Sequence, residues 1–289
     1  MGTQKQKTIV VTGGAGFIGF HLCERLFKKG HKVISLDNYF VGTTDNHVLG
    51  VEYRKGDTKD IAKHITETPD AIYHLGEYAR VEVSLEEPAR VWDFNIAGTF
   101  GVLEFWRACG CKLIYAGSST KFGDGGMGRS QSPYAWSKAS NTELIQNYGR
   151  WYALPYAVTY FYNVYGPRER SGTYGSLIEI FRKKYHAGEP LPIVAPGTQK
   201  RNFTHVFDIV EGLLLVGEKG EGNDFGIGHT REYTIRDVAE IFGGETCMLP
   251  ERRGNRMEAE LITKKTEALG WSAKRELFDY IAEVKKQNT

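Results

Sequence analysis

The chain has 289 residues, of which 41% are hydrophobic and 25% are charged, and its formal net charge at pH 7 is +2. These values are ordinary for a globular protein with one large domain, or one domain plus a smaller lobe, around a well-buried core. The basic residues are scattered, so nothing in the composition favours nucleic-acid or membrane binding as the main function.

The N-terminus and the cysteines carry no signal for export or for a metal. The segment "MGTQKQK" is polar, so we expect neither a signal peptide nor an anchor, and no apolar segment is long enough to span a membrane. Cys109 and Cys111 could form half of a metal site, but no second ligand pair follows at zinc-like spacing. For all four cysteines (Cys23, Cys109, Cys111 and Cys247) we predict buried free thiols, in a cytoplasmic protein without a metal.

Strands and helices are predicted to alternate over the first half of the chain. Short apolar runs rich in β-branched residues are typical of strands that are buried on both faces. Apolar residues at helical spacing follow the first run, and Gly30 suits the position just after a helix. This alternation predicts a parallel sheet with crossover helices. Strands are expected over 7–14, 31–37, 51–57, 71–76 and 111–119, and helices over 17–30 and 90–109.

The composition and the pattern of predicted elements change after about residue 163. Prolines and glycines cluster over 165–175 and 188–197, and three shorter helix-like segments follow, at 176–188, 206–217 and 234–243. No internal repeat and no clean linker is present. We therefore predict a first domain over 1–163 and a smaller α/β lobe over 164–289 that is interwoven with it.

A glycine-rich turn, "TGGAGFIG", joins the first predicted strand to the first helix. Glycine at this place allows a tight turn and lets the backbone approach a pyrophosphate at the helix N-terminus. Asp37 ends the second strand, where a carboxylate can accept hydrogen bonds from an adenosine ribose and would repel a 2′-phosphate. The pattern predicts NAD rather than NADP. The alternative is a plain tight turn, with Asp37 capping the end of the strand.

Asp57 has two interpretations. It ends the third predicted strand and could meet the adenine edge, or it could be the N-cap of a helix in "TKDIAKHI". The two roles are compatible.

Tyr134 has a lysine, Lys138, four residues later, which no other of the 16 tyrosines has. A helix is predicted over 134–152, and residues four apart on a helix lie on one face. A tyrosine phenol ordinarily has a pKa of about 10, so its use as a base near neutrality requires roughly 4 kcal/mol of extra preference for the phenolate. A lysine and a positively charged nicotinamide ring are a plausible source of that preference. Ser118 and Ser119 end the preceding strand and offer hydroxyls to the same reacting oxygen.

From about Lys7 to Trp271 the chain resembles the extended short-chain dehydrogenases/reductases, in the group of nucleotide-sugar epimerases and dehydratases typified by UDP-glucose 4-epimerase. The motifs that carry the resemblance are "TGGAGFIG" at 12–19, "DN" at 37–38, "GD" at 56–57, "HLG" at 74–76, "FNIAGT" at 94–99, "GSS" at 117–119, "YAWSK" at 134–138, "FYNVYGPR" at 161–168, "RNFTHVFDIV" at 201–210 and "ERRGN" at 251–255.

The resemblance implies a Rossmann doubly wound parallel sheet with a smaller C-terminal substrate-binding lobe, and it implies roles for single residues. Tyr134 would be the catalytic base and acid, Lys138 its partner, and Ser118, with Ser119 beside it, would polarise the sugar C4 oxygen. Asn95 would support the site. NAD would be bound by Gly13, Gly16, Phe17, Ile18, Gly19, Asp37, Asn38, Asp57, Thr58, Leu75, Gly76, Asn95, Tyr134 and Lys138.

The same resemblance implies a nucleotide-sugar site formed by Arg80, Ser118, Asn163, Arg201 and Arg252. Arg252 is taken as the first residue of the family's R-x-G-D pattern. From the residues alone, Asn163 could equally be a turn residue, and Arg201 and Arg252 could be surface charges.

Three reactions or roles stay open. The 4,6-dehydratases of this family have an Asp-Glu pair after the active-site hydroxyl residue, where this chain has Ser119 and Thr120, which cannot serve as carboxylate acids or bases. The first hypothesis is therefore an NAD-dependent nucleotide-sugar 4-epimerase. The second is a dehydratase or C4 dehydrogenase on the same scaffold. The third is a non-catalytic NAD-binding sensor, against which the intact Tyr134, Lys138 and Ser118 argue.

The sequence departs from the family pattern at three places. Only ten residues separate Gly123 from Tyr134, so one wall of the sugar pocket is expected to be reduced. Glu77 stands where a small apolar residue is usual. It could be an extra acid or base of the site, or an exposed acid in a loop. Lys121 is expected to face solvent or to meet a substrate carboxylate. By family resemblance we also expect a homodimer, assembled through the helices at 88–109 and 134–152.

Overall fold

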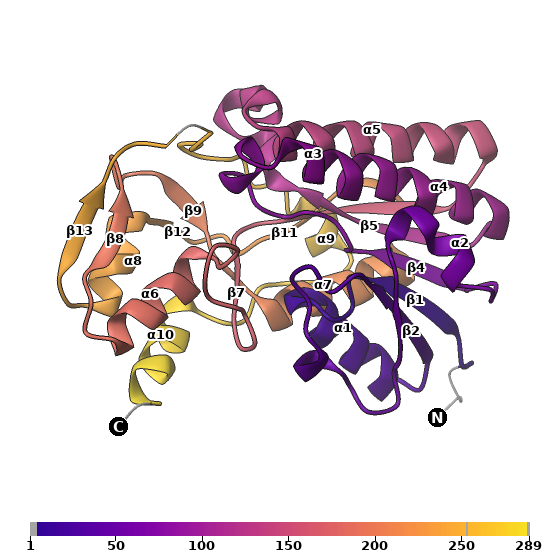
Figure 1. The fold of residues 1–289 in the computed structure, drawn as a ribbon, viewed down its shortest axis with the longest axis horizontal. Helices are drawn as coiled ribbons and strands as arrows, with labels where there is room; N and C mark the ends of the chain where they lie inside the picture. Colours follow the sequence, from indigo (N-terminus) through magenta and orange to yellow (C-terminus); the bar gives the residue numbers. More distant parts are fainter. Residues whose placement is uncertain (1–4, 253, 288–289) are drawn as a thin grey trace.

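The computed structural model describes residues 5–252 and 254–287, so most of the polar N-terminal segment lies outside the described residues (Figure 1). The centre of the fold is a seven-stranded sheet in the order β11-β6-β5-β4-β1-β2-β3, and every pair of neighbours in it is parallel. This confirms the predicted Rossmann architecture. The strands are β1 (Thr8–Thr12), β2 (Lys32–Asp37), β3 (Glu52–Lys55), β4 (Ala71–His74), β5 (Lys112–Ser118), β6 (Tyr156–Phe161) and β11 (Gly222–Ile227).

Helices cover both faces of this sheet because the central strands are apolar on both faces (Figure 1). On one face, α1 (Phe17–Lys28) and α7 (Val206–Lys219) pack on side chains such as Ile9 and Val11. On the other, α4 (Gly98–Cys109) and α5 (Pro133–Tyr152) pack on side chains such as Val10 and Leu113, together with the short α2 (Ile61–His64). Gly30 follows α1 with φ +84°, which confirms its expected place.

The helix predicted over 90–109 is present but interrupted. α3 (Pro88–Val91) and α4 are joined by a π-helical segment, Trp92–Ala97. Such wider turns often occur at functional sites. Here the segment turns Asn95 inward, where its side chain is fully buried.

The smaller lobe packs around its own apolar core, which includes Phe181 and Phe242. Two elements that follow residue 163, α7 and β11, belong to the main sheet and its covering layer, so the two parts are interwoven in sequence. The domain boundary expected at residue 163 stays a prediction. The lobe contains α6 (Leu177–His186), α8 (Ile235–Phe242), α10 (Leu277–Lys286), the parallel pair β8 (Leu191–Val194) with β13 (Thr246–Leu249), and the antiparallel pair β9 (Lys200–Asn202) with β12 (Glu232–Thr234).

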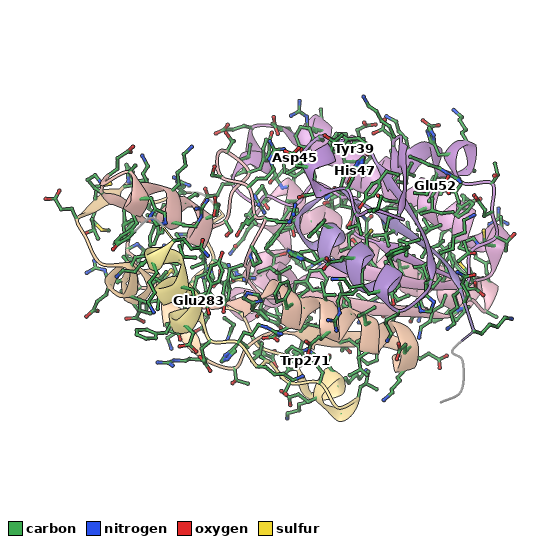
Figure 2. The ribbon with its side chains drawn as sticks, turned by 90° about the horizontal axis from the view of Figure 1, so that it is seen from below. Tyr39, Asp45, His47, Glu52, Trp271 and Glu283 are labelled. Carbon is green, nitrogen blue, oxygen red and sulfur yellow. The ribbon has the colours of Figure 1, made fainter. Side chains whose placement is uncertain are left out.

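Short elements tie the lobe to the sheet. β7 (Val164–Tyr165) pairs with β10 (Thr204–His205), and α9 (Lys264–Ala268) lies against β11. Just after α9, the buried Trp271 donates its indole N–H to the carbonyl oxygen of Asp208 at 2.9 Å, which fixes the C-terminal segment to α7 (Figure 2).

The prediction of buried thiols is wrong for part of the set. Cys23 is buried, Cys109 and Cys111 are half-buried, and Cys247 is exposed on β13, a short strand of the smaller lobe whose first three residues are all exposed. No cluster of His, Cys, Asp and Glu fit for a metal ion occurs within residues 5–252 and 254–287. None of the helices described is both long and apolar enough to cross a bilayer.

Candidate active site

The turn after β1 has the geometry that close approach to a phosphate requires. Gly13 has φ +75°, a conformation that favours glycine. A Cβ atom on Gly19 would lie 2.0 Å from the carbonyl oxygen of Gly13, so no side chain fits there. Gly16 is the N-cap of α1 and brings no side chain over the free N–H groups. The helix N-terminus is therefore open to an anion, and the turn fits the pyrophosphate of NAD.

Gly19→Ala is expected to disturb this turn. Since the new methyl group would meet backbone atoms of Gly13 and Gly14, the turn must shift, at a cost of about 1–3 kcal/mol in the free energy of unfolding. The affinity for NAD, measured by calorimetry, should fall at the same time. The matched control is Gly30→Ala, where a Cβ atom would meet nothing within 4 Å and only backbone strain is added. Equal NAD affinity in the wild type and Gly19→Ala would contradict the assignment.

Asp37 lies at the end of β2 with its carboxylate buried beside the turn. It accepts hydrogen bonds from the backbone N–H groups of Ala15 (3.0 Å) and Tyr39 (2.8 Å). Burial raises the pKa of Asp37, while these two hydrogen bonds act in the opposite direction. Each carboxylate oxygen keeps a further acceptor position, so Asp37 can also accept from a ribose hydroxyl.

Asp57 is the N-cap residue of the 3-10 turn Thr58–Asp60, as one of its two interpretations expected, but its side chain makes no capping hydrogen bond. Its carboxylate instead accepts from the Asn38 amide at 2.9 Å. This contact links the ends of β2 and β3, on the edge of the sheet where a dinucleotide binds in Rossmann folds.

One large cavity, of about 1030 Å³, runs from the glycine turn to the smaller lobe. Its volume is at the upper limit of the roughly 300–1,000 Å³ typical of a single small-molecule site, which leaves room for a cofactor and a second ligand. Asn95 is the one predicted site residue that does not line it. The lining includes Gly13, Gly16, Phe17, Ile18, Gly19, Asp37, Asn38, Asp57, Thr58, Leu75, Gly76, Arg80, Ser118, Ser119, Tyr134, Lys138, Asn163, Arg201 and Arg252.

Tyr134 lies in the first turn of α5. The helix begins here because Ser132 accepts a hydrogen bond from the Ala135 N–H at 3.1 Å and Pro133 occupies the first helical position. The Tyr134 side chain is mostly buried. Among the described residues no side chain or backbone group hydrogen-bonds to its phenol oxygen, which leaves that oxygen available to a ligand in the cavity.

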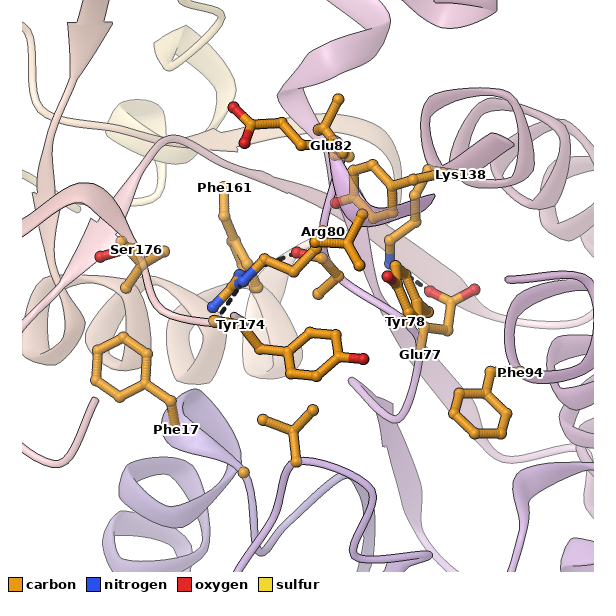
Figure 3. A pocket seen from close by; sticks show the side chains of 18 of the residues that line it. Phe17, Glu77, Tyr78, Arg80, Glu82, Phe94, Lys138, Phe161, Tyr174 and Ser176 are labelled. Atoms are coloured by element: carbon orange, nitrogen blue, oxygen red, sulfur yellow. Dashed lines mark hydrogen bonds and ion pairs between the residues drawn. The ribbon is translucent and has the colours of Figure 1, made fainter. Parts of the chain in front are cut away.

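Lys138 follows one turn later, and its ammonium group is held on two sides. It donates to the carbonyl oxygen of Ala116 at 2.6 Å and to the carboxylate of Glu77, with which it forms an ion pair (Figure 3). The Glu77 side chain is only 1% exposed. The interpretation of Glu77 as an exposed loop acid is therefore wrong: the loop after β4 turns the side chain inward, against α4 and α5.

The Glu77 carboxylate is bound by four donors of the protein. Its Oε1 atom accepts from the Thr99 hydroxyl (2.8 Å), the Tyr115 phenol (3.1 Å) and the Asn141 amide (2.7 Å), while Oε2 accepts from Lys138. Burial by itself would raise the pKa of Glu77, but the Lys138 ammonium, His74 and the hydrogen bonds together hold this pKa below its ordinary value. Glu77 is therefore an ionised residue whose Oε2 atom contacts Lys138 and whose Oε1 atom is held by three donors of the protein.

Asn95 lies behind the cavity and connects two of its walls. Its amide donates to the Ser137 hydroxyl on α5 at 2.9 Å, and its side-chain oxygen accepts from the Tyr78 N–H at 2.6 Å. Its position is consistent with the supporting role that was expected.

Sequence reasoning missed Arg256, which reaches the end of β5 from the smaller lobe. Its guanidinium group donates to the Ser119 hydroxyl at 3.2 Å and to the Asn163 side-chain oxygen at 3.4 Å. Ser118 accepts from the backbone N–H and the hydroxyl of Thr120. Arg256 lies only four residues after Arg252 in the sequence, but only the fold shows which of the two arginines points into the cavity.

The other basic residues have distinct positions. Arg252 is exposed at the rim of the cavity and pairs with Glu82. Arg201 donates to the carbonyl oxygen of Arg256 at 2.8 Å and so anchors the segment that contains it, while burial lowers the pKa of Arg201 to about 9. Lys121 is half-buried, donates to the Tyr160 phenol and does not line the cavity, so neither expected role of Lys121 is found.

Arg80 and Glu169 face the cavity from opposite lobes. Arg80 donates to the carbonyl oxygen of Tyr174 (Figure 3). Glu169 accepts from the Ser176 N–H at 2.9 Å. Burial raises the pKa of Glu169 to about 7, against the opposing effects of Ser176 and the Arg80 guanidinium. Glu169 can therefore hold a proton near neutrality.

The C-terminal part of the chain covers the place where the loop before Tyr134 is short. Residues Asp124–Ser130 form tight turns, and the Asp124 carboxylate accepts from the Met257 N–H at 2.9 Å. A further backbone bridge joins Gly123 to Ala259. The segment around Arg256 thus lies against the reduced wall of the pocket.

The site has the features of an NAD-dependent enzyme with a Rossmann fold. These are an open glycine turn, a buried acid at the end of β2, and a Tyr-Lys pair in the same cavity. The chain belongs to the NAD dependent epimerase/dehydratase family, whose model matches residues 9–228. The resemblance found in the sequence is thereby confirmed.

Three relatives place the chain within this family. It is 30% identical over 296 residues to a putative UDP-glucose 4-epimerase of Methanocaldococcus jannaschii, covering 96% of each chain. It is 29% identical to UDP-glucuronic acid decarboxylase 6 of Arabidopsis thaliana, covering 95% of this chain and 86% of the relative. The crystal structure of UDP-glucose 4-epimerase from Thermotoga maritima with UDP-glucose superposes with a TM-score of 0.90 at 28% identity, over 97% of this chain and 99% of that one. Because these relatives perform different reactions, the choice of reaction depends on the residues of the site.

Proposed function

We propose that the protein is an NAD-dependent nucleotide-sugar 4-epimerase that acts through a transient 4-keto sugar. One observation supports this above the others. Tyr134 and Ser118 line the same cavity, with Lys138 behind them, while the two positions after Ser118 hold Ser119 and Thr120 in place of carboxylates. The site can move a proton on and off a hydroxyl, and at those two positions it has no acid for elimination.

The chain's own residues divide the work as follows. Tyr134 takes the proton from the sugar C4 hydroxyl, and the Ser118 hydroxyl donates a hydrogen bond to the same oxygen. Lys138 lies one turn below and, with Asn95 fixing the neighbouring backbone, keeps the wall of the site rigid. When bound beside C4, NAD would supply the hydride acceptor for oxidation of C4 and the hydride donor for reduction of the ketone from the opposite face. Tyr134 then gives the proton back to the C4 oxygen.

The smaller lobe supplies the groups for a nucleotide sugar. Arg201, Arg252 and Arg256 bring positive charge to the wall of the cavity, and guanidinium groups can bind a diphosphate through paired hydrogen bonds. Asn163 and Arg80 add donors on the adjoining walls. This set supports a nucleotide diphosphate sugar as the substrate class.

Glu169 is the observation that favours the second candidate, a dehydratase or another reaction that needs a carboxylic acid. It lines the same cavity, and its pKa near 7 suits a general acid. If Glu169 acts in this way, a keto or unsaturated sugar should accumulate with the wild type, and Glu169→Gln should abolish that product.

The deciding experiment incubates the purified protein and NAD with UDP-, GDP-, CDP- and dTDP-sugars and identifies products by NMR. We expect a C4 epimer from one donor, with no net formation of NADH. Release of NADH with a keto sugar would instead identify a C4 dehydrogenase. NAD binding without any product across the panel would favour the sensor.

We further propose a homodimer formed through α3, α4 and α5. Trp92 and Trp136 are exposed and stack on each other with ring centroids 6.0 Å apart, and Phe100 and Trp151 are exposed on neighbouring helices. An aromatic patch of this kind on the surface favours a protein partner.

Trp136→Glu is expected to convert the dimer to a monomer, because it would bury a carboxylate at the interface. Light scattering measures this directly. Phe278→Glu, at an exposed aromatic residue on α10, is the matched control and should leave the mass unchanged. A monomeric wild type at assay concentrations would exclude the dimer.

A further inference from the structure

The positive charge of Lys138 is cancelled at short range. Its ammonium group forms an ion pair with the Glu77 carboxylate, and the two side chains are 7% and 1% exposed. A pair so far from water is screened little, and from outside it acts as a neutral group with a small dipole. Lys138 therefore contributes less positive potential at the Tyr134 phenol than an unpaired lysine would.

The other groups that surround Glu77 add no positive charge of their own near Tyr134, because they are neutral at pH 7. The Thr99 hydroxyl donates to Glu77, so it accepts from the His74 Nε2–H at 3.0 Å, and His74 Nδ1 accepts from the Thr12 hydroxyl at 2.7 Å. Burial lowers the pKa of His74 to about 4, which keeps the ring neutral at pH 7. Burial also raises the pKa of Tyr115 well above its ordinary value, so it is a neutral donor to Glu77.

Arg256 is a second cation that lines the same cavity as Tyr134. Its hydrogen-bond partners, Ser119 and Asn163, are neutral, and no ion pair to a carboxylate forms on its guanidinium group within the part of the chain that the structure describes. Burial lowers the pKa of Arg256, and among the groups that counteract this lowering Tyr134 acts most strongly. Arg80 also faces Tyr134, but above pH 7, where Glu169 on the opposite wall is mostly ionised, that carboxylate offsets its charge.

We propose that Glu77 neutralises Lys138 and that Arg256, from the smaller lobe, supplies the positive charge that stabilises the Tyr134 phenolate. This inference rests on the proposed role of Tyr134 as the base. Glu77 and Arg256 are then positioning residues with opposite effects on the phenol. Since Arg201 and Asp124 hold the segment that contains Arg256, the base is fully activated only when that segment is docked on the cavity.

The test measures ionisation of the phenol itself and needs no substrate. The phenolate absorbance is titrated in the ultraviolet with saturating NAD, and the titration of Tyr134→Phe is subtracted. Glu77→Gln keeps the shape of the side chain and removes its charge, so the phenolate should appear about one pH unit lower than in the wild type. Arg256→Gln should move it about one pH unit higher, and Arg256→Lys should stay close to the wild type.

A double variant separates charge from structure. Glu77→Gln with Lys138→Gln removes one charge of each sign, so its titration should stay within a few tenths of a pH unit of the wild type, as should a control, Asp93→Asn, at an exposed pair. The double variant also decides the case if Glu77→Gln alone does not fold.

Two outcomes would overturn the proposal. One is an unchanged titration in Arg256→Gln together with a large shift in the double variant, which would assign the charge to Lys138. The other is an unchanged titration in Glu77→Gln, which would make Glu77 a purely structural residue. Both readouts are independent of the sugar panel, so failure to find an epimerase substrate would leave them intact.

Discussion

Tyr134→Phe should lower kcat by roughly 10³-fold or more while leaving NAD affinity close to that of the wild type. The change removes one oxygen, the group proposed to exchange the proton with the sugar, and general acid–base groups of this kind typically contribute about 10²–10⁴-fold. Tyr134 lies in a preformed helix turn capped by Ser132, and its phenol makes no hydrogen bond to the described residues, so the fold has little to lose. Product formation is followed by NMR and NAD binding by calorimetry.

The matched control for this experiment is Tyr174→Phe. Tyr174 lines the same cavity, but its hydroxyl donates to the Glu87 carboxylate at 3.0 Å. Its loss should cost activity only a few-fold. If Tyr134→Phe keeps more than about a tenth of the wild-type kcat, another group is the base, since a positioned acid–base residue contributes far more.

The sequence was sufficient for the parts of the molecule that follow from local rules. Strand and helix periodicity gave the parallel sheet, because buried strands and amphipathic helices have distinct spacings. The glycine turn was equally accessible, because the close approach of Gly19 to Gly13 occurs within a single short segment. Tyr134 and Lys138 are one turn apart on one helix, so their proximity required no knowledge of the tertiary fold.

What the sequence could not reveal depends on contacts between distant segments. Glu77 and Lys138 are 61 residues apart, and only the packing of the loop after β4 against α4 and α5 turns an apparent surface acid into the partner of the lysine. Arg256 lies 137 residues from Ser119. Its position depends on the contact between the C-terminal segment and the shortened loop at Asp124. This contact cannot be predicted from the sequence of either segment alone.

The same buried pair predicts a large effect on stability. Lys138→Met would leave the Glu77 carboxylate in the interior without its cation, and breaking a buried pair in this way typically costs about 3–5 kcal/mol in the free energy of unfolding. Since domains are stable by only about 5–15 kcal/mol, the variant should be strongly destabilised at neutral pH. Urea unfolding at several pH values measures the loss.

The pH dependence identifies the group responsible. In the wild type the pKa of Glu77 is held below its ordinary value of 4.5, so its contribution to stability is present above that value and is lost as the pH falls through the lowered pKa. Without Lys138 the burial of Glu77 dominates and raises this pKa above the unfolded value, so the deficit of the variant should be largest near neutrality and shrink as the pH falls. Protonation of Glu77 then relieves the uncompensated charge.

Lys59→Met is the matched control, because Lys59 pairs with Asp93 at 2.8 Å on the surface, where both side chains are well exposed. Its loss should cost less than about 1 kcal/mol, as exposed pairs usually do, with little change over the same pH range. Equal losses in the two variants, or a Lys138→Met deficit that stays constant as the pH falls, would show that the Glu77 carboxylate is not the charge that Lys138 compensates. A deficit confined to Lys138→Met and relieved at low pH would establish that the charge of Lys138 is balanced by the buried Glu77 carboxylate.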